Sequence, residues 1–168
     1  MLAGCSSEPK KEGPPSDKDF ILNVSKGLEA RWELADNEDT DSYSSAELQK
    51  AYTKFLKAET DAVGKESKYK FKDKDLKKVA DTYYKGLKLQ EEGIQYAGTD
   101  DYTNQEKTWE LGYNYRALAI HEFEKDYGLT VNSKYKSDLD DFLSQYSVAK
   151  KEVCLLYTSD AADEARSV

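Results

Sequence analysis

The apolar side chains of this chain recur at helical spacing although the chain as a whole is strongly charged. Of its 168 residues, 35 % are charged and 38 % are hydrophobic, and the mean hydropathy is −0.87. Apolar residues scattered at random through such a chain would not bury enough surface to fold it. Here they repeat every three or four positions, which is typical of amphipathic helices. The pattern predicts an all-α fold, and the length suits one domain.

We expect about five helices between residues 18 and 151. Ser44 and Glu47 fit an S-x-x-E capping box, and Gly98 and Gly128 are suited to positions just after a helix end. The expected helix starts are, in order, Ser16 or Asp17, Ser44, Asp73 or Asp75, Asp100 or Asp101, and Ser133. Because the loops are short and each helix has one apolar face, the sequence predicts an antiparallel bundle.

Two aromatic patterns refine this prediction. Tyr69 and Phe71 alternate with lysines in a connector, which should place two rings under the bundle. The fourth helix should start near Asp100 or Asp101, carry Tyr102, Trp109, Tyr113, Ile120 and Phe123 on its apolar face, and stop at Gly128.

The N-terminus resembles the lipobox of bacterial lipoproteins. Leu2-Ala3-Gly4-Cys5 is followed by small polar residues. In lipoproteins the cysteine thiol carries a diacylglycerol and the signal peptide is cut before it, so the resemblance implies lipidation at Cys5. The charged and apolar regions of a signal peptide are missing. We therefore expect residues 1–5 to be the end of a longer signal peptide, and residues 6–17, rich in Pro, Gly, Lys and Glu, to be a disordered, flexible tether.

The helical pattern stops at Val153, and residues 152–168 are expected to be a disordered tail. The string from Val153 to Glu164 resembles translated sequencing adapter, which would make it an artefact rather than native sequence. The alternative is a genuine frayed tail.

Three segments resemble parts of small Firmicute surface lipoproteins of unknown function. They are Gly27–Trp32, Tyr69–Asp73 and Leu111–Ala117, and the likeness extends over roughly residues 18–150. It implies an extracytoplasmic helical domain, anchored by lipid to the outer face of a Gram-positive cell membrane. The resemblance implies no catalytic residues.

Composition argues against several classes of function. The net charge is −8 and lysines are interspersed among the acidic residues, which does not suit nucleic-acid binding. No stretch approaches the roughly 18 apolar residues of a membrane span, so membrane attachment would be covalent or through a partner. His121 is the single histidine, and Cys5 and Cys154 are the two cysteines. We therefore expect no metal, no cofactor and no histidine-based catalysis.

The acidic stretch Asp36–Glu47 has the oxygen-ligand spacing of an EF-hand loop. Its sixth position, however, is Asp41, where the loop needs glycine for its sharp turn. A solvated loop is favoured over a cation site. We expect His121 to be exposed, and Tyr84, Tyr115 and Tyr127 would have to be exposed to form a glycan-stacking surface.

Only two arginines, Arg31 and Arg116, precede the tail, and both project onto the apolar faces of their helices. On the second expected helix, Glu59 lies between Tyr52 and Phe55 in a helical-wheel projection, again on the apolar face. Because a buried guanidinium needs a carboxylate, we predict that Glu59 pairs with Arg116 or Arg31 inside the bundle. We interpret this pair as a packing and register device rather than a ligand site.

These features favour a non-catalytic surface interaction module that binds a protein or a cell-wall polymer. One alternative is an accessory domain of a longer lipoprotein whose C-terminal part carries the activity. The other is a cation-binding or hydrolytic protein that uses the acidic loop 36–47. An interaction module predicts an exposed apolar or aromatic patch, whereas a hydrolase predicts a concave site lined by several carboxylates.

Overall fold

The computed structural model describes residues 14–154, and the regular secondary structure within that range is entirely helical. The predicted all-α bundle is confirmed. Cys5, most of the expected tether and residues 155–168 lie outside the described residues.

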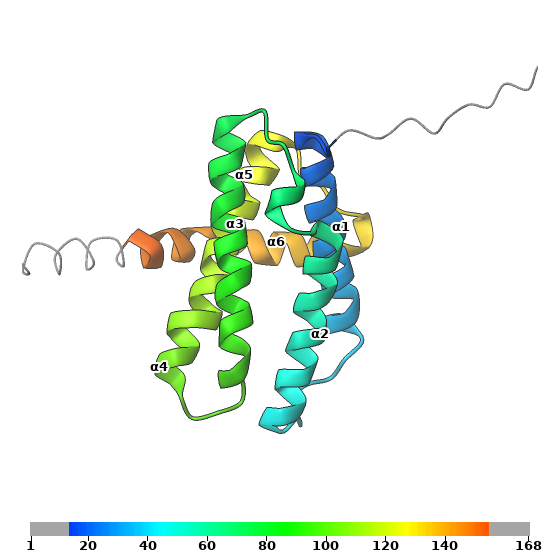
Figure 1. The fold of residues 1–168 in the computed structure, drawn as a ribbon. Coiled ribbons are helices and arrows are strands. Elements are labelled where there is room, and N and C mark those ends of the chain that lie inside the picture. The colour runs from blue at the N-terminus through cyan, green and yellow to red at the C-terminus, as the bar shows by residue number, and fades with distance from the viewer. Residues whose placement is uncertain (1–13, 155–168) are drawn as a thin grey trace, which may run out of the picture.

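Four long helices run in alternating directions along the bundle (Figure 1). They are α1 (Asp17–Asp36), α2 (Ser45–Val63), α3 (Lys74–Gly93) and α5 (Leu111–Tyr127). The shorter α6 (Lys136–Ser144) crosses the others in Figure 1 and packs against α5. Helical conformation resumes over residues 146–154, which we call the C-terminal segment. Single 3-10 turns occupy Glu66–Lys68, Ile94–Tyr96 and Ser133–Tyr135.

Side-chain caps fix the starts of the first three helices. Ser16 and Ser44 each form a capping box, with Asp19 and Glu47 respectively. The Asp73 carboxylate accepts hydrogen bonds from the backbone N–H groups of the first turn of α3. Each cap satisfies donors that have no partner inside the helix. These helix starts agree with those expected from the sequence. The end of α5 at Gly128, whose φ is 70°, also agrees with the expectation.

The predicted fourth helix runs without a gap from Tyr102 to Tyr127, but it is not α-helical throughout. It consists of α4 (Tyr102–Gln105), a π-helical turn (Glu106–Glu110) and α5, and we refer to Glu106–Glu110 as the π-turn. A π-turn inserts one residue into the helix and rotates everything before it relative to the stripe that follows. Tyr102, expected inward, is therefore 70 % exposed.

Two tightly packed helix pairs make up the bundle, α1 with α2 and α3 with α5. At the α3–α5 contact, Gly86 and Gly112 meet so closely that a Cβ on Gly112 would lie 2.6 Å from the Gly86 carbonyl oxygen. Gly27 plays the same part on α1, where a Cβ would lie 3.0 Å from the Glu59 carbonyl oxygen. Glycine thus lets the backbones approach within each pair.

The apolar core at one end of the bundle is built around Phe20. Its ring makes edge contacts with Tyr69, Phe71 and Phe123, with centroids 5.0–5.5 Å apart. The connector before α3 therefore tucks its two aromatic rings under the bundle, as the sequence predicts.

The domain limits of 18–151 need correction at both ends. Asp17 belongs to α1, and its carboxylate accepts hydrogen bonds from the backbone N–H groups of Lys72 and Asp73 at 3.0 Å. At the other end the helix continues through Cys154, and Val153 is only 5 % exposed. Burial of Val153 makes residues 152–154 part of the folded domain.

Candidate functional site

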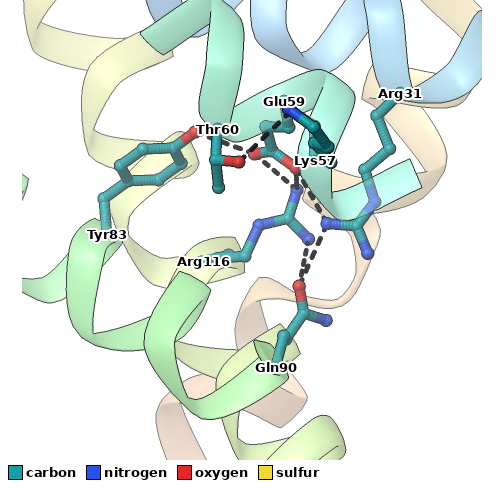
Figure 2. Close-up of polar contacts among 7 residues, drawn as sticks. All are labelled: Arg31, Lys57, Glu59, Thr60, Tyr83, Gln90 and Arg116. Carbon is teal, nitrogen blue, oxygen red and sulfur yellow. Dashed lines mark hydrogen bonds and ion pairs between the residues drawn. The ribbon is translucent and has the colours of Figure 1, made fainter. Parts of the chain in front are cut away.

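Five polar or charged side chains meet in the middle of the bundle (Figure 2). We call them the central polar cluster: Arg31 from α1, Glu59 from α2, Tyr83 and Gln90 from α3, and Arg116 from α5. Because both helix pairs contribute, the cluster links the α1–α2 pair to the α3–α5 pair.

Glu59 is the common acceptor of the central polar cluster. Its Oε1 accepts from the Tyr83 hydroxyl at 2.8 Å and from Arg116 Nη2 at 2.8 Å. Its Oε2 accepts from Arg31 Nη1 at 2.8 Å and from Arg116 Nη2 at 2.7 Å. The side-chain carbonyl of Gln90 accepts from both guanidinium groups, at 3.1 Å from Arg31 and 3.2 Å from Arg116.

Burial and charge oppose each other in this cluster. Burial acts to raise the pKa of Glu59, but Arg116 and Arg31 overcome it and lower that pKa to about 2. Burial is also the main cause of a lowered pKa for Arg31, followed by repulsion from Arg116. Two cations share one carboxylate, so the cluster carries one excess positive charge in the interior.

An aromatic ring lies against each of the two guanidinium groups. The Cζ of Arg31 lies 5.7 Å from the Trp109 ring centroid, and that of Arg116 lies 5.2 Å from the Phe142 ring centroid. These are distances at which a cation is attracted to a ring face. Glu59 is fully buried and Arg116 is 2 % exposed. We conclude that the cluster fixes the relative position of the two helix pairs and is not an open ligand site.

The sequence placed Glu59 with one arginine, and the structure pairs it with both. Sequence reasoning missed the parts played by Tyr83 and Gln90. A signal was present, since Gln90 follows Tyr83 by seven residues and so lies on the same inward stripe of α3. A fully buried glutamine on an apolar stripe requires a polar partner.

A groove with a volume of about 710 Å³ opens beside the π-turn, and we call it the π-turn groove. One wall is the π-turn with the start of α5, and the other is Gln145, which directly follows α6, with the C-terminal segment. Its lining residues are Glu106, Lys107, Trp109, Glu110, Leu111, Tyr113, Asn114, Gln145, Val148 and Glu152. π-turns occur frequently at functional sites, because the inserted residue changes which side chains face outward.

Two aromatic residues connect the π-turn groove with the interior. Trp109 stacks on Tyr52, with centroids 4.8 Å apart and an interplanar angle of 14°, and it also contacts Arg31 of the central polar cluster. Tyr113 packs edge-on against Phe142 at 4.8 Å, and burial raises the pKa of its hydroxyl. Opposite them, Val148 is 54 % exposed. The groove is therefore partly apolar and open to solvent.

Gly93 of α3 packs directly against the π-turn. A Cβ at this position would lie 2.7 Å from both the Thr108 hydroxyl oxygen and the Trp109 backbone nitrogen. Thr108 also donates to the Asn104 carbonyl oxygen at 2.6 Å. The π-turn therefore packs against α3 at Gly93, and its residue Trp109 forms part of the groove wall.

The other residues considered from the sequence do not join a site. Glu47, the last ligand position of the acidic loop, accepts hydrogen bonds at 2.8 Å from both the backbone nitrogen and the hydroxyl of Ser44. Within residues 14–154, no group of three or more histidine, cysteine or acidic side chains is placed to hold a metal ion. Tyr115 is buried, and Tyr84 and Tyr127 are half-buried, so these tyrosines do not form an exposed glycan-stacking surface.

His121 was expected to be exposed, but it is half-buried. Its ring stacks on Tyr146 of the C-terminal segment, with centroids 3.6 Å apart and an interplanar angle of 9°. The prediction of exposure was wrong because the residue that covers His121 lies on a different helix, which the pattern of α5 does not reveal.

Comparison of this chain with protein-family models, with curated proteins and with solved structures finds no match. Among the helices of residues 14–154, none is both long enough and apolar enough to cross a membrane.

Proposed function

We propose that this protein is a lipid-anchored, extracytoplasmic helical module that binds a partner through the π-turn groove and catalyses no reaction. The observation that carries the proposal is the groove itself, where Trp109, Tyr113 and Val148 line a concave surface open to solvent. Open, partly apolar concavities with a few polar groups are the usual form of binding sites. The buried, hydrogen-bonded central polar cluster behind Trp109 would hold this surface in a fixed shape.

The proposed location rests on the sequence. The lipobox-like segment ending at Cys5 supports attachment to the outer face of the cell membrane, at the end of a tether that would hold the helical domain clear of it. The same features would suit an accessory domain of a longer lipoprotein. A cation-dependent or hydrolytic role is less well supported, because the Glu47 carboxylate already caps α2.

The anchor is tested by expressing the protein with a complete signal peptide in a Gram-positive host. The protein should partition into detergent, and Cys5→Ser should move it to the aqueous phase because the thiol that would carry the lipid is gone. Equal partitioning of both forms would contradict lipidation at Cys5.

The groove is tested by placing a photoreactive amino acid at position 148 and, as a matched control, at position 22. Val148 and Leu22 are large apolar residues with nearly equal exposure, 54 % and 52 %, and Leu22 lies on α1 outside the groove. Irradiation of intact cells should give a discrete cross-linked species from position 148 only. Identical patterns from the two positions would argue against a binding groove.

A further inference from the structure

We propose that the π-turn groove binds a cationic amphipathic segment of a partner protein. This inference rests on the proposed function, since it names the chemistry of the partner for the same groove. It is drawn from the charges at the groove rim, the aromatic walls and the helical shape of both walls.

The charges at the rim of the π-turn groove are mainly negative and come from both walls. Glu106 and Glu110 lie on the π-turn, and Glu152 lies across from them on the C-terminal segment. Lys107 is the single basic residue of the lining. A ligand that lies between these walls meets three carboxylates and one ammonium group. Charge complementarity therefore favours a partner rich in lysine or arginine.

The same charges disfavour anionic partners. Anionic membrane surfaces and phosphate-rich polymers would meet like charge at both walls, in a protein whose net charge is already −8. Juxtaposed like charges cost binding free energy and slow association. Among the partners that a lipid-anchored protein would encounter, a basic protein segment fits this rim better than an anionic surface.

The walls suit the stems of basic side chains as well as their charges. Trp109 and Tyr113 supply aromatic surface within the carboxylate rim, and lysine and arginine side chains pack their methylene stems on such surface while the charged end meets an acidic group. Trp109 already contacts a guanidinium on its inner side, that of Arg31 at 5.7 Å. Val148 and Leu111 add aliphatic surface for an apolar anchor.

The form of the groove favours a helical ligand. Both walls are helical segments, and an amphipathic helix that enters such a groove places apolar residues every three or four positions against it. Its basic residues would flank that stripe and meet the carboxylates of the rim.

The test uses a fluorescently labelled synthetic helix of about 18 residues, long enough for about five turns, made of leucine and lysine in an amphipathic pattern. A counterpart carries glutamate in place of each lysine. Fluorescence anisotropy with the purified protein should give saturable binding of the lysine peptide, at least about tenfold tighter than that of the glutamate peptide. Chemical-shift changes in the wild-type protein should map to the groove. Absence of binding by the lysine peptide, or shifts confined to another surface, would overturn the inference.

Two triple variants separate the groove from the overall charge. One reverses the rim with Glu106→Lys, Glu110→Lys and Glu152→Lys. The matched control reverses three exposed carboxylates outside the groove, with Glu92→Lys, Glu124→Lys and Asp126→Lys. Each replacement adds two charges, so both variants change the net charge from −8 to −2.

The rim variant should bind the lysine peptide at least about tenfold more weakly, and the control variant should stay within about twofold of the wild type. Equal weakening in both would show attraction to the overall charge and overturn the inference. Tighter binding of the glutamate peptide, abolished by Val148→Asp, would also overturn it while leaving the groove as a binding site. Binding of neither peptide, together with identical cross-linking from positions 148 and 22, would contradict the proposed function itself.

Discussion

A single nitrogen of Arg116 bridges both carboxylate oxygens of Glu59, at 2.8 Å from Oε1 and 2.7 Å from Oε2. This contact ties α5 to α2 across the two helix pairs. Arg31 adds a second cation to the same carboxylate, so the central polar cluster holds two guanidinium groups for one carboxylate. Because there are two cations for one carboxylate, replacing the carboxylate and replacing one cation should lower the free energy of unfolding by different amounts.

We therefore expect Glu59→Gln to destabilise the protein more than Arg31→Met. The glutamine variant leaves two buried cations without a counter-charge and should lower the free energy of unfolding by about 3–5 kcal/mol. Arg31→Met leaves the Arg116–Glu59 pair neutral and should cost less than about 2 kcal/mol. Urea unfolding measures both values. Asp61→Asn, which removes the exposed Lys57–Asp61 pair, is the control and should cost less than about 0.5 kcal/mol. Equal costs for the first two variants would contradict this account of the charges.

The lowered pKa of Glu59 also predicts part of the dependence of the unfolding free energy on pH. Its pKa is about 2 in the folded protein against an ordinary 4.5, so the folded state favours the ionised form. That contribution is complete above pH 4.5 and is lost as pH falls toward 2, because the unfolded chain takes up the proton first. The difference in unfolding free energy between the wild type and Glu59→Gln should therefore shrink across this window. Urea titrations at several pH values measure it, and a constant difference would count against the prediction.

Gly86→Ala should destabilise the protein although alanine is the better helix former. A Cβ at Gly86 would lie 2.7 Å from both the Gly112 carbonyl oxygen and Arg116 Cγ, so α3 and α5 would have to separate. We expect a net loss of about 1–3 kcal/mol after the gain of up to about 1 kcal/mol in helix propensity. Gly27→Ala, whose nearest contacts would be at 3.0 Å, is the milder comparison. A more stable Gly86→Ala protein would show that the helices can separate at little cost.

The burial of Val153 leads to a prediction for the C-terminal segment. The sequence predicts a disordered tail from residue 152 onward, but Val153 is almost completely buried. A chain that ends at Glu152 should be less stable by about 1.5–3 kcal/mol, the value of burying a valine side chain. A chain that ends at Cys154 keeps that side chain and serves as the comparison. Thermal unfolding of the two should differ by several degrees. Coincident midpoints would mean that Val153 contributes no packing.

The helix starts and the buried charges follow from local patterns, which is why the sequence predicts them. A capping box such as Ser44–Glu47 is complete within four residues, and a helical wheel places Glu59 and Arg116 on inward faces without knowledge of their partners. The wheel does not say which faces meet. It therefore left open whether Glu59 would find Arg31 or Arg116, and the antiparallel packing of four helices brings both.

The π-turn groove was not predictable in the same way. A π-turn has no compositional signature of its own, and Glu106–Glu110 reads as ordinary helix. Its accompanying contact, the bare backbone of Gly93 against Trp109, joins residues from different helices. Once the turn is present, the phase of the helix changes and Tyr102 moves into solvent. The groove is thus a product of tertiary packing.

The position of Trp109 gives the protein an optical reporter of its own. The chain contains only two tryptophans, and Trp109 stands between the groove lining and a buried guanidinium, stacked on Tyr52. Indole emission depends on the polarity and charge around the ring, so an occupant of the groove would change the emission from the outer side while the cluster holds the inner side constant. Trp32→Phe would leave Trp109 as the only tryptophan, and ligands could then be screened by its intrinsic fluorescence on unlabelled protein.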